Sequence, residues 1–209
     1  MATLAEIRTW VSKRLQDPNN TSISASDVDA LTNQAIRYWN DSRFFFNEVT
    51  DTATLTQGDA TIPIPSHWLC PSIDNCFVIE YSGIRYPLKK VSEMVYNSTF
   101  LTNGVGQPEI FTKQANSGYQ CYPIPDRAYT VRRFYLKEYN ALSGDSDTNE
   151  FTTHAEDLIK YTAVAYGSRD FRQDIQMYQA FIDQANTEEQ ALINETRKNN
   201  ATGSLTIYS

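Results

Sequence analysis

The stretch Tyr-Thr-Val-Arg-Arg-Phe-Tyr-Leu-Lys-Glu-Tyr, residues 129–139, is the longest alternating run of apolar and polar residues in this chain of 209 residues. Alternation with a period of two is typical of a β-strand that buries one of its faces. The pair Asp126-Arg127 comes just before the run and is expected to form a turn. Because strand-like runs recur upstream, from about residue 44, the sequence predicts an antiparallel sheet in the middle of the chain.

Turn sequences divide that region into hairpins. Each turn contains a glycine, which adopts the positive φ values that tight hairpin turns need. We expect three hairpins: residues 48–56 with 60–64 around Gln57-Gly58-Asp59, residues 76–81 with 84–88 around Ser82-Gly83, and residues 109–114 with 119–123 around Asn116-Ser117-Gly118. Pro63 and Pro65 restrict residues 60–64 to the edge or the end of a strand. A short helix is expected at residues 91–101, capped by Ser92 or a neighbour.

Two helices are expected in the first forty residues. Thr3 and Glu6 fit a capping box, in which the threonine oxygen accepts a backbone N–H and the glutamate reaches back. Ser26 and Asp29 are the expected caps of the second helix. The apolar stripes are Leu4, Ile7, Val11 and Leu15 in the first helix and Val28, Leu31, Ala35 and Trp39 in the second. The connecting loop is short, so the two helices should pack as an antiparallel hairpin.

The C-terminal part of the chain returns to helical periodicity. Residues 143–150 are polar and acidic and are predicted to form a linker. Thr153 and Glu156 fit a further capping box, and a last helix is expected at about residues 175–197. The apolar positions are Leu158, Ile159, Thr162, Ala165 and Tyr166 in the helix after the linker and Tyr178, Ile182, Ala185 and Leu192 in the last one.

The order helices, strands, helices predicts an α+β fold. Each terminal helix pair has too narrow an apolar stripe for a core of its own, so helices from both ends are expected to share one bundle. The predicted domains are a helical bundle of residues 1–43 and 151–198, a β-rich insertion lobe of residues 44–142, and a C-terminal tail of residues 199–209.

Charge and composition exclude some classes of function. The net charge is −7, whereas a general nucleic-acid binder needs a basic surface. An acidic wall past which DNA slides is compatible with this charge. We expect no association with a membrane, because no apolar run approaches spanning length. The three cysteines, an odd number without a secretory signal, are expected to be reduced and buried in a protein made in a cytoplasm: Cys70, Cys76 and Cys121.

Residue types that serve catalysis or ligand binding occur without their usual companions in the sequence. His67 lies in a proline-rich loop and His154 near the start of a helix, and no Gly-x-Ser-x-Gly motif accompanies them. The spacing of the cysteines to His67 fits no standard zinc motif. Further isolated signals are Gly104-Val105-Gly106, which lacks the rest of a phosphate loop, and the adjacent acidic pairs Glu156-Asp157 and Glu188-Glu189. We therefore predict no enzymatic activity, no cofactor and no bound metal.

Three stretches, taken in order, resemble the head-to-tail adaptor (connector) proteins of tailed bacteriophages, especially short-tailed ones. The resemblance covers about residues 3–195. The stretches are the first helical hairpin with Arg37-Tyr38-Trp39-Asn40 and Phe44-Phe45-Phe46-Asn47-Glu48; then Tyr122-Pro123-Ile124-Pro125-Asp126-Arg127-Ala128-Tyr129 with Phe134-Tyr135; and then Leu142-Ser143, the acidic linker and Phe151-Thr152-Thr153-His154 before an Ala- and Tyr-rich helix.

The resemblance implies a structural virion protein without catalytic residues. Such a protein would be made in the bacterial host cytoplasm and placed at the head–tail junction. It would form a ring of about 12 copies below the portal, contact the portal ring and tail or nozzle proteins, and line a channel that packaged DNA crosses without specific binding. The C-terminal tail would dock on the portal or on a neighbouring copy by adding a strand, through Leu205, Thr206, Ile207 and Tyr208. Without the resemblance, the residues of this tail favour a frayed chain end.

Two other hypotheses about function compete with that of an adaptor. The first is a carbohydrate- or ligand-binding β module of a larger assembly, which would use aromatic residues of the β lobe such as Tyr119, Tyr122, Tyr129 and Tyr135. The second is an enzyme whose carboxylates are dispersed along the sequence. The mass of the protein in solution separates them from an adaptor, which should form rings or bind a portal ring.

Overall fold

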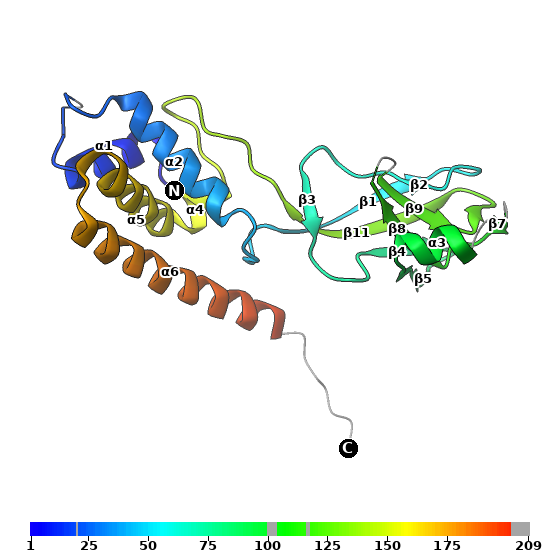
Figure 1. The fold of residues 1–209 in the computed structure, drawn as a ribbon. Coiled ribbons are helices and arrows are strands. Elements are labelled where there is room, and N and C mark those ends of the chain that lie inside the picture. Colours follow the sequence, from blue (N-terminus) through cyan, green and yellow to red (C-terminus); the bar gives the residue numbers. More distant parts are fainter. Residues whose placement is uncertain (20, 100–103, 116–117, 202–209) are drawn as a thin grey trace, which may run out of the picture. The chain divides into compact units, whose positions relative to one another are not determined.

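The computed structural model describes residues 1–19, 21–99, 104–115 and 118–201, and it divides into two compact units (Figure 1). We call residues 48–137 the β unit. The helical unit consists of residues 1–47 and the chain from Glu138 onward. Helices at both ends and an antiparallel sheet region between them confirm the predicted α+β class. The β unit starts four residues after the start of the predicted lobe of residues 44–142, and Phe44 is fully buried in the helical core. The helical unit takes in residues 138–150, which the predicted bundle of residues 1–43 and 151–198 left out.

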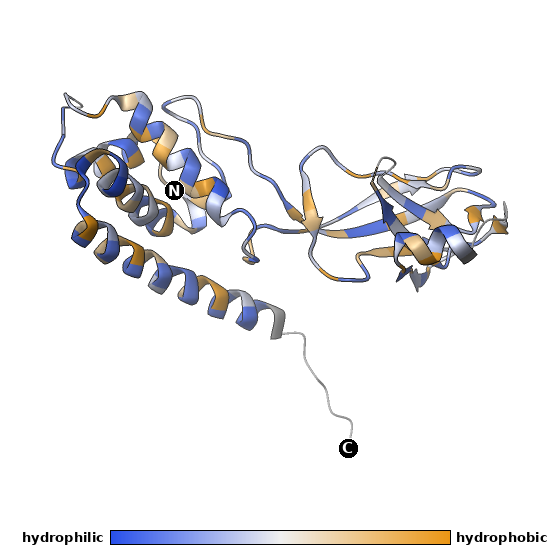
Figure 2. Cartoon of the chain, in the orientation of Figure 1, coloured by the Kyte–Doolittle hydropathy of each residue, from blue (hydrophilic) through white to orange (hydrophobic). Residues whose placement is uncertain are grey.

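The helical unit is built from helices of both ends of the chain. Its elements are α1 (Leu4–Arg14), α2 (Ala25–Trp39), α4 (Glu150–His154), α5 (Glu156–Gly167), the π-helical turn η1 (Ser168–Arg172) and α6 (Ile175–Ala201). Every residue of the two predicted N-terminal stripes is buried in one core together with apolar residues of α5 and α6, which confirms the shared bundle. Figure 2 shows apolar and polar residues alternating along α2 and α6, as expected of amphipathic helices.

Helix caps agree with the prediction at one of three sites. The capping box of Thr3 and Glu6 is present. The second helix is capped by Ser24 and Asp27 instead of Ser26 and Asp29, because Asp29 is engaged by Arg8, whose Nε lies 2.7 Å from its Oδ1. The third box is formed by Asn149 and Thr152, so the prediction of Thr153 and Glu156 is wrong.

The predicted linker is packed against the helices. The Asp147 carboxylate accepts N–H bonds from Ser143 and Gly144, and backbone carbonyls of Asp145 and Asp147 accept the N–H groups of Ala5 and Leu4. The segment thus satisfies donors at the start of α1, which a helix cannot satisfy internally. Composition alone identified a polar loop and could not show that this loop caps a helix.

The β unit consists of two main sheets around a second core. Its elements are β1 (Glu48–Leu55), β2 (Thr61–Ile62), β3 (Trp68–Pro71), β4 (Phe77–Tyr81), β5 (Ile84–Pro87), β6 (Lys89–Lys90), α3 (Glu93–Thr99), β7 (Val105–Gly106), β8 (Ile110–Gln114), β9 (Gly118–Tyr122), β10 (Ile124–Pro125) and β11 (Tyr129–Lys137). One sheet has the order β1-β11-β4-β5, with β3 also paired to β11, and the other has the order β2-β9-β8-β6. The alternating run that begins at Tyr129 is therefore the central strand.

Two of the three predicted hairpins are confirmed, namely β4–β5 and β8–β9, as is the short helix α3. The first predicted hairpin is wrong. β1 pairs along its whole length with β11, whereas β2 pairs with β9 in the other sheet. At the turn between them, Gly58 N–H bonds the Pro125 carbonyl. The long alternating β11 offers eight partners to β1, and the short segment with Pro63 offers few donors.

Among the residues that the structure describes, no helix is both long and apolar enough to span a bilayer.

Candidate interaction surfaces

His67 belongs to a polar network that joins three segments of the β unit. Its Nε2 lies 2.7 Å from the Tyr135 hydroxyl, which donates to the Asp51 carboxylate at 3.2 Å. Arg133 binds the same carboxylate through Nε and Nη2 at 2.6 and 2.7 Å, and its Nη1 donates to the Pro63 carbonyl. Burial, and next the charge of Asp51, raise the pKa of Tyr135 to about 12, so the phenol stays a neutral donor. The network ties β1, β11 and the β2–β3 loop together.

His154 packs against aromatic rings of the helical unit. Its ring stacks on Phe46 with centroids 5.6 Å apart and meets the edge of Phe45 at 5.3 Å. A cavity of about 160 Å³ beside it is lined by Glu156, Asp157 and Glu188 among others. His154 and the two acidic pairs, which were considered separately in the sequence, thus contribute side chains to one cavity. Glu156 is paired with Lys160, and no cluster of three or more metal-ligating side chains occurs within the described part of the chain.

Two of the cysteines are buried, as predicted. Cys76 and Cys121 are fully inaccessible, and burial raises the pKa of each thiol to about 12. Cys70 is half-buried, and all three are free thiols. Neutral buried thiols behave as small apolar groups.

The glycines near residue 105 serve packing. A Cβ at Gly104 would lie 2.5 Å from the Tyr122 hydroxyl, so any other residue would require the Tyr122 ring to shift. Val105 and Gly106 form β7, which pairs in parallel with β10.

The tyrosines proposed for carbohydrate binding do not form an exposed platform. Tyr119 and Tyr129 are 4% exposed and Tyr135 is fully buried, which leaves only Tyr122 half-buried. A sugar stacks on an aromatic ring only when the ring's face is accessible. The prediction of this platform is therefore wrong. Alternation along β9 and β11 directs these rings into the core instead.

An exposed aromatic and cationic cluster lies where the β4–β5 hairpin meets the turn before β11. The Arg127 guanidinium lies 5.0 Å from the Tyr81 ring centroid and donates to its hydroxyl at 3.0 Å, and it also binds Asp126. Arg127 lowers the pKa of Tyr81. Tyr81 is 41% exposed and Ile84, on the other side of the turn, 55%. From the sequence, only the turn at Asp126-Arg127 was predicted. The contact between Arg127 and Tyr81 was not predicted, because these two residues are far apart in the chain.

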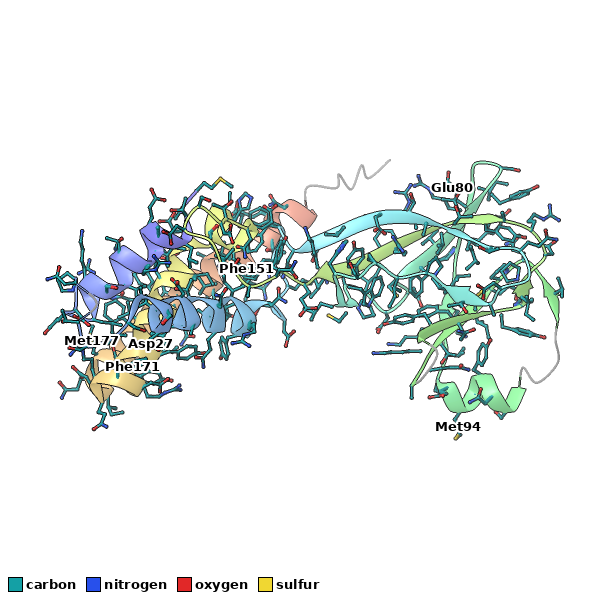
Figure 3. The ribbon with its side chains drawn as sticks, turned by 90° about the horizontal axis from the view of Figure 1, so that it is seen from above. Asp27, Glu80, Met94, Phe151, Phe171 and Met177 are labelled. Carbon is teal, nitrogen blue, oxygen red and sulfur yellow. The ribbon has the colours of Figure 1, made fainter. Side chains whose placement is uncertain are left out.

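Further apolar side chains are exposed on both units. In the β unit, Met94 on α3 is 79% exposed and points away from the sheets (Figure 3). In the helical unit, Phe171 and Ile175 are exposed where η1 leads into α6. Trp10 on α1 is half-buried, and Arg14 and Lys160 lie 5.1 and 5.5 Å from its ring centroid. Arginine, aromatic and methionine side chains of this kind are enriched at protein–protein interfaces.

The net negative charge of the chain comes from its C-terminal part. Residues 1–137 contain 13 acidic and 13 basic residues, whereas residues 138–209 contain 12 acidic and 5 basic ones. The whole net charge of −7 therefore comes from the segment that holds α4, α5 and α6. Within α6, no lysine or arginine occurs from Ile175 to Thr196.

The tail residues predicted to dock, Leu205, Thr206, Ile207 and Tyr208, lie outside the described residues.

Exposed aromatic, apolar and arginine side chains thus occur on both units, and such side chains are suited to contacts with other proteins. The chain belongs to the SU10 adaptor protein family, which it matches over residues 2–207. This confirms the resemblance to phage adaptors and makes the chain a member of a family of structural bacteriophage proteins. No curated protein matches the chain.

Proposed function

We propose that this protein is the head-to-tail adaptor of its virion, forming a ring of about 12 copies below the portal and connecting the capsid to the tail. The observation that carries the proposal is the family match over residues 2–207, together with the exposed apolar and arginine side chains. The portal ring and tail or nozzle proteins are its partners. The protein acts by contact and not as an enzyme.

The charge distribution supports a channel that DNA crosses. A wall facing DNA must not bind phosphates, so it should be poor in lysine and arginine. α6 meets this requirement along 22 consecutive residues, from Ile175 to Thr196. In the proposed ring the helical units lie side by side with α6 toward the lumen, and the β units face outward or toward the tail. The tail residues 199–209 dock on the portal or a neighbouring copy.

The test uses purified portal rings from the same phage. The full-length protein should co-sediment with them at about one copy per portal subunit, and electron microscopy of the complex should show an added ring. Free protein at the same concentration serves as the control for self-sedimentation. Recovery of the chain only in the supernatant, and its absence from purified virions, would refute the proposal.

A further inference from the structure

The first strand of the β unit is an edge without the usual protection against pairing. β1 lies at one end of the sheet order β1-β11-β4-β5 and pairs with β11 from Glu48 to Leu55 without a register shift. It contains no proline and no lysine, and its one charge beyond the first residue, Asp51, is bound by Arg133 of β11. Natural edge strands are normally short, bulged or interrupted by proline or charge, because an open edge pairs with other chains.

The opposite edge of the same sheet carries such protection. β5 is four residues long and contains Arg85 and Pro87. One edge of a single sheet is thus blocked and the other is left open, which is the arrangement expected if β1 receives a strand in the assembly.

The backbone of β1 has groups available for such a strand. In an antiparallel pair, alternate residues direct both N–H and C=O away from the partner strand. Within the described residues, the backbone of Val49–Leu55 makes its hydrogen bonds to β11 alone. Side chains on one face of β1 are the exposed Thr50, Thr52 and Thr54, and those on the other include Ala53 and Leu55, which pack in the core.

We propose that β1 receives the segment Leu205–Tyr208 of a second copy of this chain as an added edge strand. The inference rests on the proposed function, in which copies lie side by side. The segment Leu-Thr-Ile-Tyr alternates as β1 does. Leu205 and Ile207 extend the apolar face of Ala53 and Leu55, whereas Thr206 and Tyr208 extend the threonine face. Pairs of β-branched and aromatic residues across strands are favourable.

The residues after α6 include the segment proposed to pair with β1. Residues 202–209 follow α6, and eight extended residues span roughly 26 Å. The segment carries no charged side chain, so its pairing with β1 requires no desolvation of a charge on the added strand.

The first arm of the test is a cross-link between copies. Thr206→Cys is combined with Thr50→Cys, Thr52→Cys or Thr54→Cys in a Cys70→Ser background and oxidised, both concentrated in solution and bound to portal rings. A disulfide forms only when the two Cα atoms come within about 7 Å, so at least one pair should give dimers and longer ladders. Thr206→Cys with Thr130→Cys is the matched control, since Thr130 is exposed on the same sheet face but lies on the central strand. Cross-links within one chain only, or none in either preparation, would overturn the proposal.

The second arm of the test blocks strand addition at the edge of β1. Thr52→Lys should weaken association between copies about tenfold or more, because a lysine on an edge opposes strand addition. Thr130→Lys should leave it unchanged, and both variants should unfold at the wild-type denaturant concentration. Deletion of residues 202–209 should match Thr52→Lys, and the two changes together should add nothing. Additive losses would show two separate sites and contradict the pairing.

The outcomes of the two proposals are separable. If the protein binds no portal ring, the proposed function fails, while the cross-links in solution still decide whether β1 receives the tail. If portal binding is normal but Thr52→Lys and the cross-links have no effect, the strand proposal alone fails.

Discussion

Asp51 and Arg133 face each other across the β1–β11 pair, with the guanidinium bound to both carboxylate oxygens at 2.6 and 2.7 Å. The arginine side chain is 8% exposed and the aspartate 31%. Two parallel bonds of this kind orient both partners and define which residues of the two strands stand opposite. Since Asp51 also accepts the Tyr135 hydroxyl, one carboxylate organises the polar network of the β unit.

Arg133→Met should therefore destabilise the protein. The change removes the Arg133 donor to the Pro63 carbonyl and leaves Asp51 with the Tyr135 hydroxyl as its remaining partner. We expect a loss of about 2–3 kcal/mol in the free energy of unfolding by urea. The matched control is Arg132→Met on the same strand, where the arginine is 31% exposed and lies 3.7 Å from Glu80. This more accessible and longer pair should cost less than about 1 kcal/mol. Equal losses for the two variants would contradict the role of the network.

Gly167 is required where α5 approaches α1 and α2. A Cβ at this position would lie 2.6 Å from Leu15 Cδ1 and 3.1 Å from Leu31 Cδ1, and both leucines are buried. Gly167→Ala should lower stability by about 1–3 kcal/mol through overpacking, although alanine favours helix. Combining it with Leu15→Ala should cost less than the sum of the two single changes, because the second removes the clash. Calorimetric unfolding of the four proteins completes this cycle.

Asp17 makes part of the stability dependent on pH. Its carboxylate accepts bonds from the Thr21 hydroxyl and from the N–H groups of Ile23, Thr21 and Ser22, which hold its pKa well below the ordinary value. A lowered folded-state pKa stabilises the protein above the unfolded value, near 4, and this contribution disappears as pH falls below it. Asp17→Asn should therefore unfold at lower urea than wild type at pH 7, and the gap should narrow at pH 3. A gap that widens on acidification would have the wrong sign.

The buried cysteines should be unreactive in the folded protein. At pH 8 a thiol with a pKa of about 12 is ionised in roughly one molecule in ten thousand. A disulfide reagent should label Cys70 first, and Cys76 and Cys121 only after unfolding. Mass spectrometry of peptides taken at intervals gives the order. Rapid labelling of Cys121 without urea would show that the β unit opens readily.

Lysines introduced into α6 should slow the passage of DNA. Gln184→Lys and Gln190→Lys introduce charges at two exposed positions of the helix that is free of lysine and arginine up to Thr196. If α6 faces the channel, virions with this pair should assemble normally and release DNA severalfold more slowly at low salt, with the delay reduced as salt is raised. Gln57→Lys, exposed in the β unit, is the control. Normal release from the α6 variant at all salt concentrations would place α6 away from DNA.

Local sequence patterns predicted the helices and turns, whose formation depends on residues that are close together in the chain. The stripes Leu4 to Leu15 and Val28 to Trp39 are buried as predicted, because helical periodicity places such residues on one face. The β4–β5 turn was predicted at Ser82-Gly83 because glycine suits tight hairpin turns, and both residues adopt positive φ there, at 51° and 78°. Which residues cap a helix also depends on partners that are distant in the sequence. Asp29, which was predicted as a cap, instead binds Arg8.

The sequence by itself determined the α+β class, the helices at both ends, the central role of the run from Tyr129, and the adaptor family. The tertiary structure alone decided that β1 pairs with β11, that Tyr119, Tyr129 and Tyr135 face the core, that Arg127 meets Tyr81, and that β1 is an open edge. The physical reason is that strand pairing joins residues that are far apart in the chain, as in Asp51 with Arg133, which are separated by 82 positions. Local propensity carries no information about which of several similar strands will stand beside another.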